Sequence, residues 1–299
     1  MDFLDSLPTL NLKKKMSSQE KIDQTNKAYR IFKVKKLHAG VGAKNIAFFS
    51  LQHGSGNSEI AFNTALKLAE HNRVLYVSTE FYSSIFYEYQ LAIHNKELQA
   101  ISDLEHGMDK IITIADLKDR HKDDPFTPSI KQFSSNLSYL RVTPKFQTQA
   151  VKMSLTDLKA VLKKFKVAIQ TRFDYIIFDL ENDLHTITSQ LLLNYVSDIV
   201  LTFNQNIVQI DTLGNFIDFA ENNLAGKNTY CVLNQYNNNA IAEIRPSYIK
   251  QMIDHKINAV ITQDTALFWN AAFNALPPIY YDQTGKISAE IDKICQLIL

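Results

Sequence analysis

The chain has 299 residues, of which 45% are hydrophobic and 21% charged, the composition of an ordinary soluble globular protein. That length suffices for one large α/β domain, or for two small ones, with a sizeable core. No stretch approaches the roughly 18 consecutive apolar residues of a membrane span, and the N-terminus lacks the apolar segment of a secretory signal. We therefore expect a cytoplasmic protein, and leave open a peripheral attachment to a membrane or to the nucleoid.

The first 40 residues are basic, with nine Lys and Arg side chains against four Asp and Glu, a net charge of +5. Because the whole chain has a net charge of +1, the remainder is mildly acidic. We interpret residues 1–43 as a basic N-terminal extension, too short to be a domain, and residues 44–299 as a single domain. The extension is either a solvated tail or a surface for acidic lipid, nucleic acid or a protein partner.

From residue 45 onward, apolar runs of strand length alternate with stretches of helical periodicity. The expected strands are Ile46–Leu51, Arg73–Ser78, Leu137–Val142, Tyr175–Leu180, Ile199–Asn204, Tyr230–Asn234 and Ile257–Ile261. The expected helices are Ile60–Glu70, Ser84–His94, Ser154–Thr171, Ile187–Tyr195, Ile210–Asn223, Pro246–His255 and Ala266–Asn274. Near-continuous apolar strands with helical crossovers predict an α/β three-layer sandwich, with a mostly parallel sheet of about seven or eight strands flanked by helices.

The first expected strand leads into a tight polar turn, Gln52–Ser58, which is followed by a helix. Glycines two apart in such a loop, here Gly54 and Gly56, present backbone N–H groups at a helix N-terminus, where an anion is favoured. A standard phosphate loop, G-x-x-x-x-G-K-S/T, has a lysine where this chain has Asn57. The stretch thus has the pattern of a phosphate loop without its lysine.

Two further strands end in polar side chains. The run F-D-Y-I-I-F-D ends in Asp179, and a carboxylate at the tip of a central strand beside a phosphate loop can hold Mg²⁺ through its water shell. The run V-L-N ends in Asn234, whose amide can both donate to and accept from a purine edge. A strand that ends in Asp is common in α/β proteins, so each signal is weak alone and gains weight from the order of all three.

In that order the three stretches resemble the MinD/ParA family of deviant-Walker P-loop ATPases, from about residue 44 to the C-terminus. The family's loop reads K-G-G-x-G-K-S/T-T, and Gly54, Gly56 and Ser58 match it. Gln52 stands in place of the signature lysine that reaches the partner's nucleotide across the dimer. Asn57 stands in place of the lysine that holds the β- and γ-phosphates.

The resemblance implies weak binding of ATP or ADP with Mg²⁺. The nucleotide-binding residues that it implies are Gly54, Ser55, Gly56, Asn57, Ser58 and Asn234, and the implied Mg²⁺ ligands are Ser58 and Asp179. Asp179 is also the only residue to which a catalytic role could be assigned. The resemblance further implies a homodimer and a protein partner in a partition or assembly system.

The chain departs from the family where catalysis occurs. Ser78 replaces the aspartate that prepares the attacking water, and Glu181–Asp183 replaces the Pro-Pro-Gly that follows the Walker B strand. Because positive charge on the phosphoryl group is the main catalytic device in this chemistry, we expect hydrolysis to be slow or absent. The stretch Y-V-S-T-E-F-Y looks most like the atypical TadZ branch, whose members position pilus machinery.

Three functions remain open from the sequence. The first is a positioning or partitioning protein that binds adenine nucleotide and dimerises, and the second is a nucleotide-free pseudo-ATPase scaffold in a pilus, secretion, plasmid or conjugation machinery. The third, a tyrosine kinase or an iron-protein reductase on this fold, lacks the tyrosine-rich tail of the kinase and the cluster cysteines of the reductase. The aromatic residues Phe81–Tyr89 are either core or a partner surface. We expect Ile291–Leu299 to be a helix packed on the sheet, and Cys231 and Cys295 to be reduced core residues.

Overall fold

The computed structural model describes residues 42–79, 130–141, 152–182, 186–224, 226–239, 245–274, 276–282 and 285–299. Strands and helices alternate along most of these residues. The strands are β1 (Lys44–Phe49), β2 (Val74–Ser78), β3 (Lys131–Gln132), β4 (Leu137–Arg141), β5 (Tyr175–Asp179), β6 (Asp198–Phe203), β7 (Asn228–Tyr236) and β8 (Ile257–Thr262). The helices are α2 (Asn57–Leu68), α6 (Leu155–Ile169), α7 (Ile187–Tyr195), α8 (Ile207–Asn223), α9 (Pro246–Ile253), α10 (Thr265–Phe273), α11 (Pro278–Tyr281) and α12 (Lys286–Ile298).

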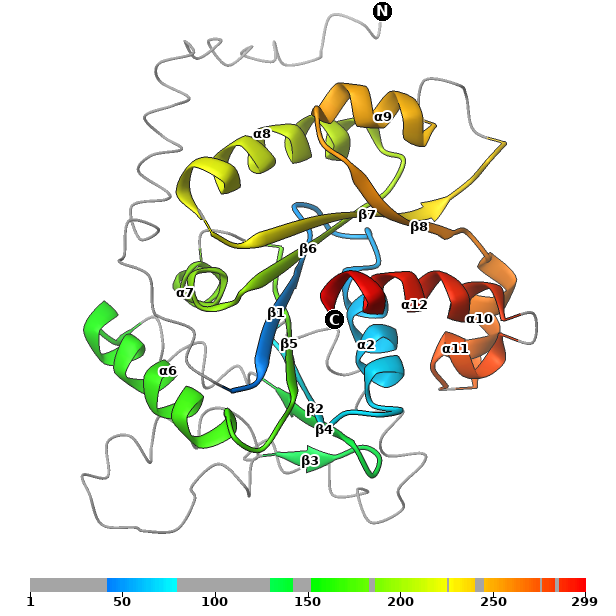
Figure 1. Cartoon of the computed structure of the whole chain (residues 1–299). Helices are drawn as coiled ribbons and strands as arrows, with labels where there is room; N and C mark the ends of the chain where they lie inside the picture. The colour runs from blue at the N-terminus through cyan, green and yellow to red at the C-terminus, as the bar shows by residue number, and fades with distance from the viewer. Residues whose placement is uncertain are drawn as a thin grey trace, which may run out of the picture.

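All eight strands join one sheet in the order β3-β4-β2-β5-β1-β6-β7-β8, which Figure 1 shows between two layers of helices. Every neighbouring pair is parallel except β3 and β4, which are antiparallel. The prediction of an α/β sandwich with a mostly parallel sheet is confirmed. Because β1 lies between β5 and β6, the ends of these three central strands meet at the same edge of the sheet.

Each face of the sheet has its own hydrophobic core. One core joins the sheet to α6, α7, α8 and α9, and the other joins it to α2 and α12, with side chains of α10 and α11 at its margin. Successive residues of β1 point to opposite cores, with Phe48 in the second and Phe49 in the first. The strands are therefore apolar on both faces, as parallel strands covered by helices must be.

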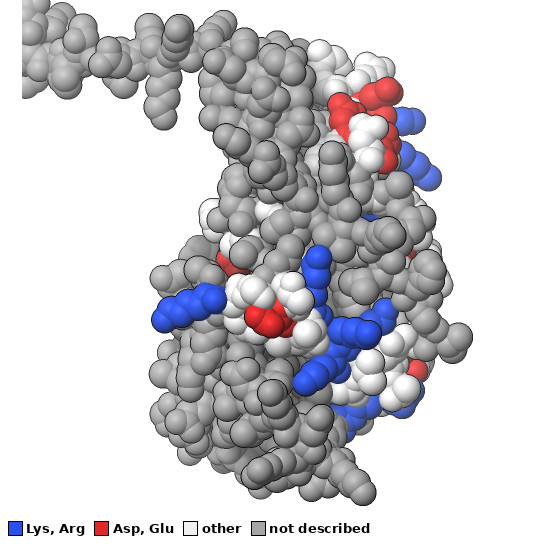
Figure 2. Space-filling model, turned by 90° about the vertical axis from the view of Figure 1, so that its left-hand side faces the viewer, with Lys and Arg blue, Asp and Glu red and all other residues white. Residues whose placement is uncertain are grey.

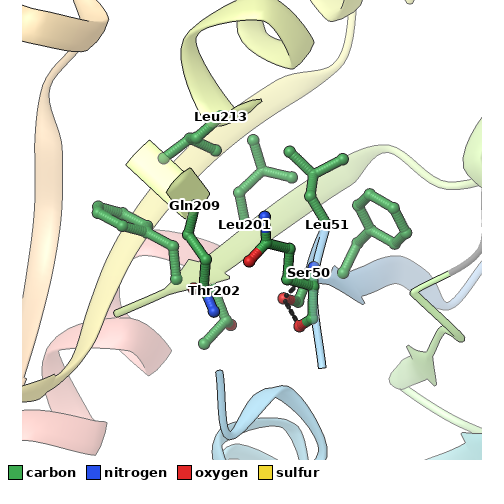
Figure 3. Close-up of a pocket in the computed structure, with 9 residues that line it drawn as sticks. Ser50, Leu51, Leu201, Thr202, Gln209 and Leu213 are labelled. Carbon is green, nitrogen blue, oxygen red and sulfur yellow. Dashed lines mark hydrogen bonds between the residues drawn. The ribbon is translucent and has the colours of Figure 1, made fainter. Parts of the chain in front are cut away.

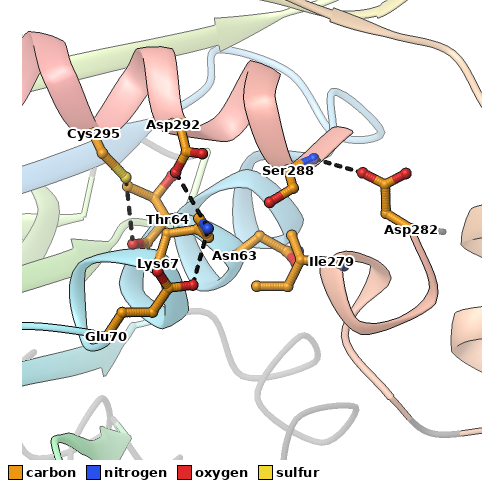
Figure 4. Close-up of polar contacts among 9 residues, drawn as sticks. All are labelled: Asn63, Thr64, Lys67, Glu70, Ile279, Asp282, Ser288, Asp292 and Cys295. Atoms are coloured by element: carbon orange, nitrogen blue, oxygen red, sulfur yellow. Dashed lines mark hydrogen bonds and ion pairs between the residues drawn. The ribbon is translucent and has the colours of Figure 1, made fainter. Parts of the chain in front are cut away.

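The last helix packs on the helix that follows the loop, as Figure 4 shows. The Lys67 ammonium pairs with the carboxylates of Glu70 at 2.9 Å and of Asp292 at 3.4 Å, and the Cys295 thiol lies 4.0 Å from the Thr64 carbonyl oxygen. Five α12 side chains enter the core: Ile287, Ile291, Ile294, Cys295 and Ile298. The prediction of a packed C-terminal helix is confirmed, and both cysteines are free and buried.

The expected strands and helices that fall on described residues are all present, with boundaries that coincide or differ by up to three residues, except that the last helix begins five residues earlier than expected, at Lys286. The sequence prediction missed β3, because a two-residue strand has no periodicity to detect. The expected helix Ser84–His94 and the aromatic residues Phe81–Tyr89 lie outside the described residues. The division into an extension, 1–43, and a domain, 44–299, stays a prediction.

Among the described residues, no helix is long and apolar enough to cross a membrane. The face of the molecule that carries α6 shows basic side chains in its described part, with a few acidic ones among them (Figure 2). Lys163 and Lys164 on α6 are exposed there. The basic side chains in the described part of this face would attract an acidic partner.

Candidate functional site

The loop between β1 and α2 takes the backbone conformation that its glycines allow. Gly54 and Gly56 have φ of 79° and 76°, in the left-handed region that disfavours other residues. Gly56 is the N-cap of α2 and makes no side-chain cap, so the first N–H groups of the helix are not used by a capping side chain. The loop thus presents a helix N-terminus of the kind that binds anions.

Two side chains at the end of β7 are hydrogen-bonded to this loop. The Asn234 amide donates to the Ser55 carbonyl oxygen at 2.8 Å, and the Gln235 amide donates to that of Gly54 at 3.4 Å. A Cβ atom at Gly56 would lie 2.3 Å from the Asn234 nitrogen, so any other residue would displace this amide as well as strain the left-handed backbone. The β7–β8 register shifts at this point and Gln235 has a φ of 53°, an irregularity that aims both side chains at the loop. The structure therefore brings the predicted Asn234 onto the predicted glycine loop.

The side chain of Asn57, at the lysine position of a phosphate loop, turns down toward the sheet. Its Nδ2 donates to Asp179 Oδ1 at 2.9 Å and to the Phe48 carbonyl oxygen at 3.2 Å. Its Oδ1 is buried and has no hydrogen-bond partner among the described residues. The amide donor is thus used inside the protein, where a lysine of the standard loop would reach a phosphate.

Asp179 is fully buried at the end of β5, and both of its carboxylate oxygens accept hydrogen bonds. The Tyr76 hydroxyl donates to Oδ2 at 2.7 Å, opposite the bond from Asn57 to Oδ1. The Tyr76 ring is held by an edge-on contact with Phe62, at 5.2 Å between centroids, and by stacking with Tyr139 at 5.9 Å. Sequence reasoning missed Tyr76, although a tyrosine in an otherwise apolar strand usually has a partner for its hydroxyl.

The end of β2 is also closed by hydrogen bonds. The Thr79 hydroxyl donates to the Asp179 main-chain oxygen at 2.9 Å and accepts from the Glu181 N–H at 3.0 Å. Ser78, at the position where the MinD/ParA pattern has its water-activating aspartate, is fully buried. The neighbouring Glu80 lies outside the described residues. A buried serine has no carboxylate with which to activate a water molecule.

The charges carried by the loop and the first turns of α2 do not favour an anion. Residues 45–66 contain no Lys or Arg, and Glu59 lies in the first turn of α2. Burial raises the pKa of the Glu59 carboxyl to about 7, against a smaller opposite effect of the hydrogen bond from Asn63. An anion at this site would be held by backbone N–H groups and neutral side chains.

A small cavity lies on the other side of the loop, between the ends of β1 and β6 and the start of α8 (Figure 3). Its volume of about 10 Å³ corresponds to roughly one water molecule. Ser50, Gln52, Thr202 and Gln209 contribute the polar part of its lining. Thr202 is 2% exposed, and its hydroxyl has no hydrogen-bond partner among the described residues.

No family model matches the chain, and no curated protein matches it. Solved structures do. A ParA family ATPase from Chlorobium tepidum TLS superposes with a TM-score of 0.64 at 16% identity, over 85% of this chain and 98% of that one. A plasmid partition protein from Borrelia burgdorferi B31 bound to AMPPNP gives 0.65 at 16% identity, over 86% and 98%. This chain has the ParA/MinD fold.

The septum site-determining protein MinD from Pyrococcus horikoshii OT3, complexed with Mg-ADP, superposes with a TM-score of 0.60 at 18% identity, over 86% of this chain and 96% of that one. The ParA/MinD likeness extends beyond the loop to most of the chain. At such identities it shows the fold, and the chemistry must be argued from the residues of this chain.

The predicted nucleotide-binding residues lie together at the carboxyl edge of the sheet, on the loop and at the end of β7. Asp179 lies beneath them, and Ser58 is partly buried on the first turn of α2. Mg²⁺ needs octahedral coordination and keeps several water molecules. Because Asp179 is 0% exposed and both its oxygens already accept hydrogen bonds, the predicted ligand pair does not fit the ion in this arrangement. Among the described residues, no three His, Cys, Asp or Glu side chains gather as a metal site either.

Proposed function

We propose that the protein is a MinD/ParA-like positioning or partitioning protein that binds adenine nucleotide weakly and hydrolyses it very slowly or not at all. The observation that carries this proposal is the loop itself. Its two left-handed glycines stand at the start of α2 with Asn234 against them, while the lysine position is occupied by a side chain turned away from the loop.

Binding is supported by the geometry of the loop. Backbone N–H groups at a helix N-terminus attract phosphate without any side-chain charge, and Gly54 has open space where a Cβ would stand. Asn234 lies against the loop and, through its bond to the Ser55 carbonyl oxygen, helps to hold the loop in this conformation. Two of the similar structures were solved with AMPPNP and with Mg-ADP.

Loss of hydrolysis is supported by what surrounds the loop. Neither Gln52 nor Asn57 supplies the positive charge that stabilises a phosphoryl group in transfer, and Ser78 supplies no carboxylate for the attacking water. The partly buried Glu59 adds a carboxyl group where the MinD/ParA loop pattern has a threonine. A protein of this kind would act by binding and assembly, as a homodimer and with a protein partner.

The second candidate is a nucleotide-free scaffold of the same fold, in the assembly of a larger machinery. The observation that favours it is the downward Asn57, whose donor is already used by Asp179 and the Phe48 carbonyl. In that case the basic extension, together with the basic face on α6, would provide the contacts to an acidic membrane, a nucleic acid or a protein.

Calorimetric titration of the full chain with ATP and ADP separates the two candidates. Nucleotide binding predicts measurable heat and a rise in melting temperature, and no phosphate release above background. The absence of both heat and thermal shift would leave the scaffold. Phosphate release that disappears in Asp179→Ala would contradict the claim that hydrolysis is lost.

Asn57→Lys tests the loop directly. A lysine at this position adds a charge-assisted bond to phosphate, so ATP affinity should rise about 10- to 100-fold, corresponding to ~1.4–2.8 kcal/mol. Asn215→Lys, which adds the same charge on the exposed side of α8, is the matched control and should leave affinity within about twofold. Equal affinities for the wild type and Asn57→Lys would mean that the loop does not cradle phosphate.

A further inference from the structure

The orientation of the Asn57 amide is set by Asp179. The Nδ2 atom of Asn57 faces two acceptors, Asp179 Oδ1 at 2.9 Å and the Phe48 carbonyl oxygen at 3.2 Å. Rotation of the amide by 180° would place its Oδ1 against both acceptors and lose both bonds. The amide is therefore fixed, and its oxygen remains buried without a partner among the described residues.

In this orientation, the position that holds a cationic donor in a standard loop has an unused hydrogen-bond acceptor. A standard loop presents a cation to the β- and γ-phosphates, whereas Asn57 directs its donor to the sheet and leaves an acceptor atom unused. An unpaired buried acceptor does not attract a phosphate oxygen. At this position no positively charged side chain stabilises the additional negative charge of the γ-phosphate of ATP.

Asp179 is held in the same way from the other side. The Tyr76 hydroxyl, 2.7 Å from Asp179 Oδ2, occupies the second carboxylate oxygen, and the Tyr76 ring is fully buried between Phe62 and Tyr139. Because Asp179 is 0% exposed, a hydrated divalent ion could reach its carboxylate only if the side chains packed around it moved. The carboxylate that could hold Mg²⁺ is thus used to tie β2, β5 and α2 together.

We propose that Asn57, Asp179 and Tyr76 form a buried clamp that makes the loop indifferent both to Mg²⁺ and to the γ-phosphate. The consequence of the clamp rests on the proposed function: when the loop binds nucleotide, ATP and ADP bind with nearly equal affinity and without a divalent ion. Such a protein does not change state when ATP replaces ADP, because neither Asn57 nor Asp179 distinguishes the two nucleotides.

The first test is a titration of the full chain with ATP and with ADP. Each nucleotide is titrated once with Mg²⁺ in excess and once in EDTA. The clamp predicts four dissociation constants within about threefold of one another. Binding that needs Mg²⁺, or an ATP preference above about tenfold, would overturn the clamp while the proposed function stood. No binding in any condition would remove the proposed function, and the second test then decides on the clamp.

The second test is a double-mutant cycle in EDTA, without nucleotide, read as melting temperature. If the Tyr76 hydroxyl holds the Asp179 carboxylate, Tyr76→Phe should lower the melting temperature by at most half as much in the Asp179→Asn background as in the wild type. Both variants keep the shape of the side chain, so folding is retained. Additive losses would overturn the clamp.

Tyr230→Phe provides the matched control for the cycle. Its hydroxyl faces a different aspartate, Asp198 at 3.4 Å, at the opposite edge of the sheet. The losses from Tyr230→Phe and Asp179→Asn should therefore add within experimental error. A comparable coupling in this pair would show that the cycle reports general loosening of the sheet, and the clamp would lose its support.

Discussion

Two aspartates of the central strands are equally buried and yet are held in different ways. Asp198, at the start of β6, lies 3.5 Å from the Lys44 ammonium and accepts hydrogen bonds from Ser197 at 2.6 Å and Asn228 at 2.9 Å. Asp179, at the end of β5, accepts from the neutral amide of Asn57 and the neutral hydroxyl of Tyr76. Both carboxylates are 0% exposed.

The difference follows from where the two residues lie in the sheet. The amino edge of a parallel sheet carries no ligand site in this class of fold, so a carboxylate there can be paired with a cation for structure alone. Ligands bind at the carboxyl edge, and a cationic side chain fixed there would interact with the ligand. In this chain the carboxyl edge has been filled with neutral donors, which suits a site that holds a ligand without acting on it.

The largest effect is expected at the amino edge. Asp198→Ala leaves Lys44 without this partner and removes an acceptor of Ser197, Asn228 and Tyr230, which should lower the free energy of unfolding by about 3 kcal/mol. Urea denaturation measures the loss, and nucleotide affinity should stay within about twofold. Asp211→Ala, on the exposed side of α8, is the control. A loss below about 1 kcal/mol would mean that this ion pair is no more than a surface contact.

Glu59 offers the next largest effect, at the carboxyl edge. Burial raises the pKa of its carboxyl from 4.5 to about 7, so the folded chain binds this proton more tightly than the unfolded chain. The cost of ionisation is absent below about pH 4.5, grows between pH 4.5 and 7, and is complete above that range. Glu59→Gln should therefore raise the free energy of unfolding at pH 8 by up to about 3 kcal/mol, and leave it unchanged at pH 4.5. An equal gain at both pH values would attribute the effect to packing and not to charge.

The smallest effects compare two hydroxyl groups on or beside the same strand. Thr202→Val removes a buried hydroxyl that has no partner among the described residues, and should change stability by less than about 0.5 kcal/mol or increase it. Ser197→Ala removes a hydroxyl that donates to the Asp198 carboxylate, and should cost about 1–2 kcal/mol. Thermal melts of the two variants in one buffer test the order. A larger loss in Thr202→Val would indicate that a water molecule in the small cavity satisfies its hydroxyl.

Much of the fold could be predicted from the sequence, because parallel strands are apolar runs of fixed length and the helices between them repeat every three to four residues. The loop, Asp179 and Asn234 could also be predicted, since each follows directly from a strand end. The short antiparallel strand β3 could not, because its two residues carry no pattern.

The clamp could not be read from the sequence either. Tyr76 and Asp179 meet because β2 and β5 are neighbours in the sheet although they are 103 positions apart. The direction of the Asn57 amide depends on the Asp179 carboxylate, a partner 122 positions away. Residue types at strand ends therefore indicate where a site lies, while the hydrogen bonds that decide its chemistry require the register of the sheet.

The packing of α12 on α2 has a consequence for how the protein is made. On a ribosome, the loop and α2 emerge well before α12, and the apolar side of α2 meets α12 only when residues 286–298 have been synthesised. Until then Thr64 and Lys67 lack their α12 partners, Cys295 and Asp292. The nascent chain would thus carry an uncovered second core until α12 has left the ribosome, long after α2, and this half of the molecule can be completed only then.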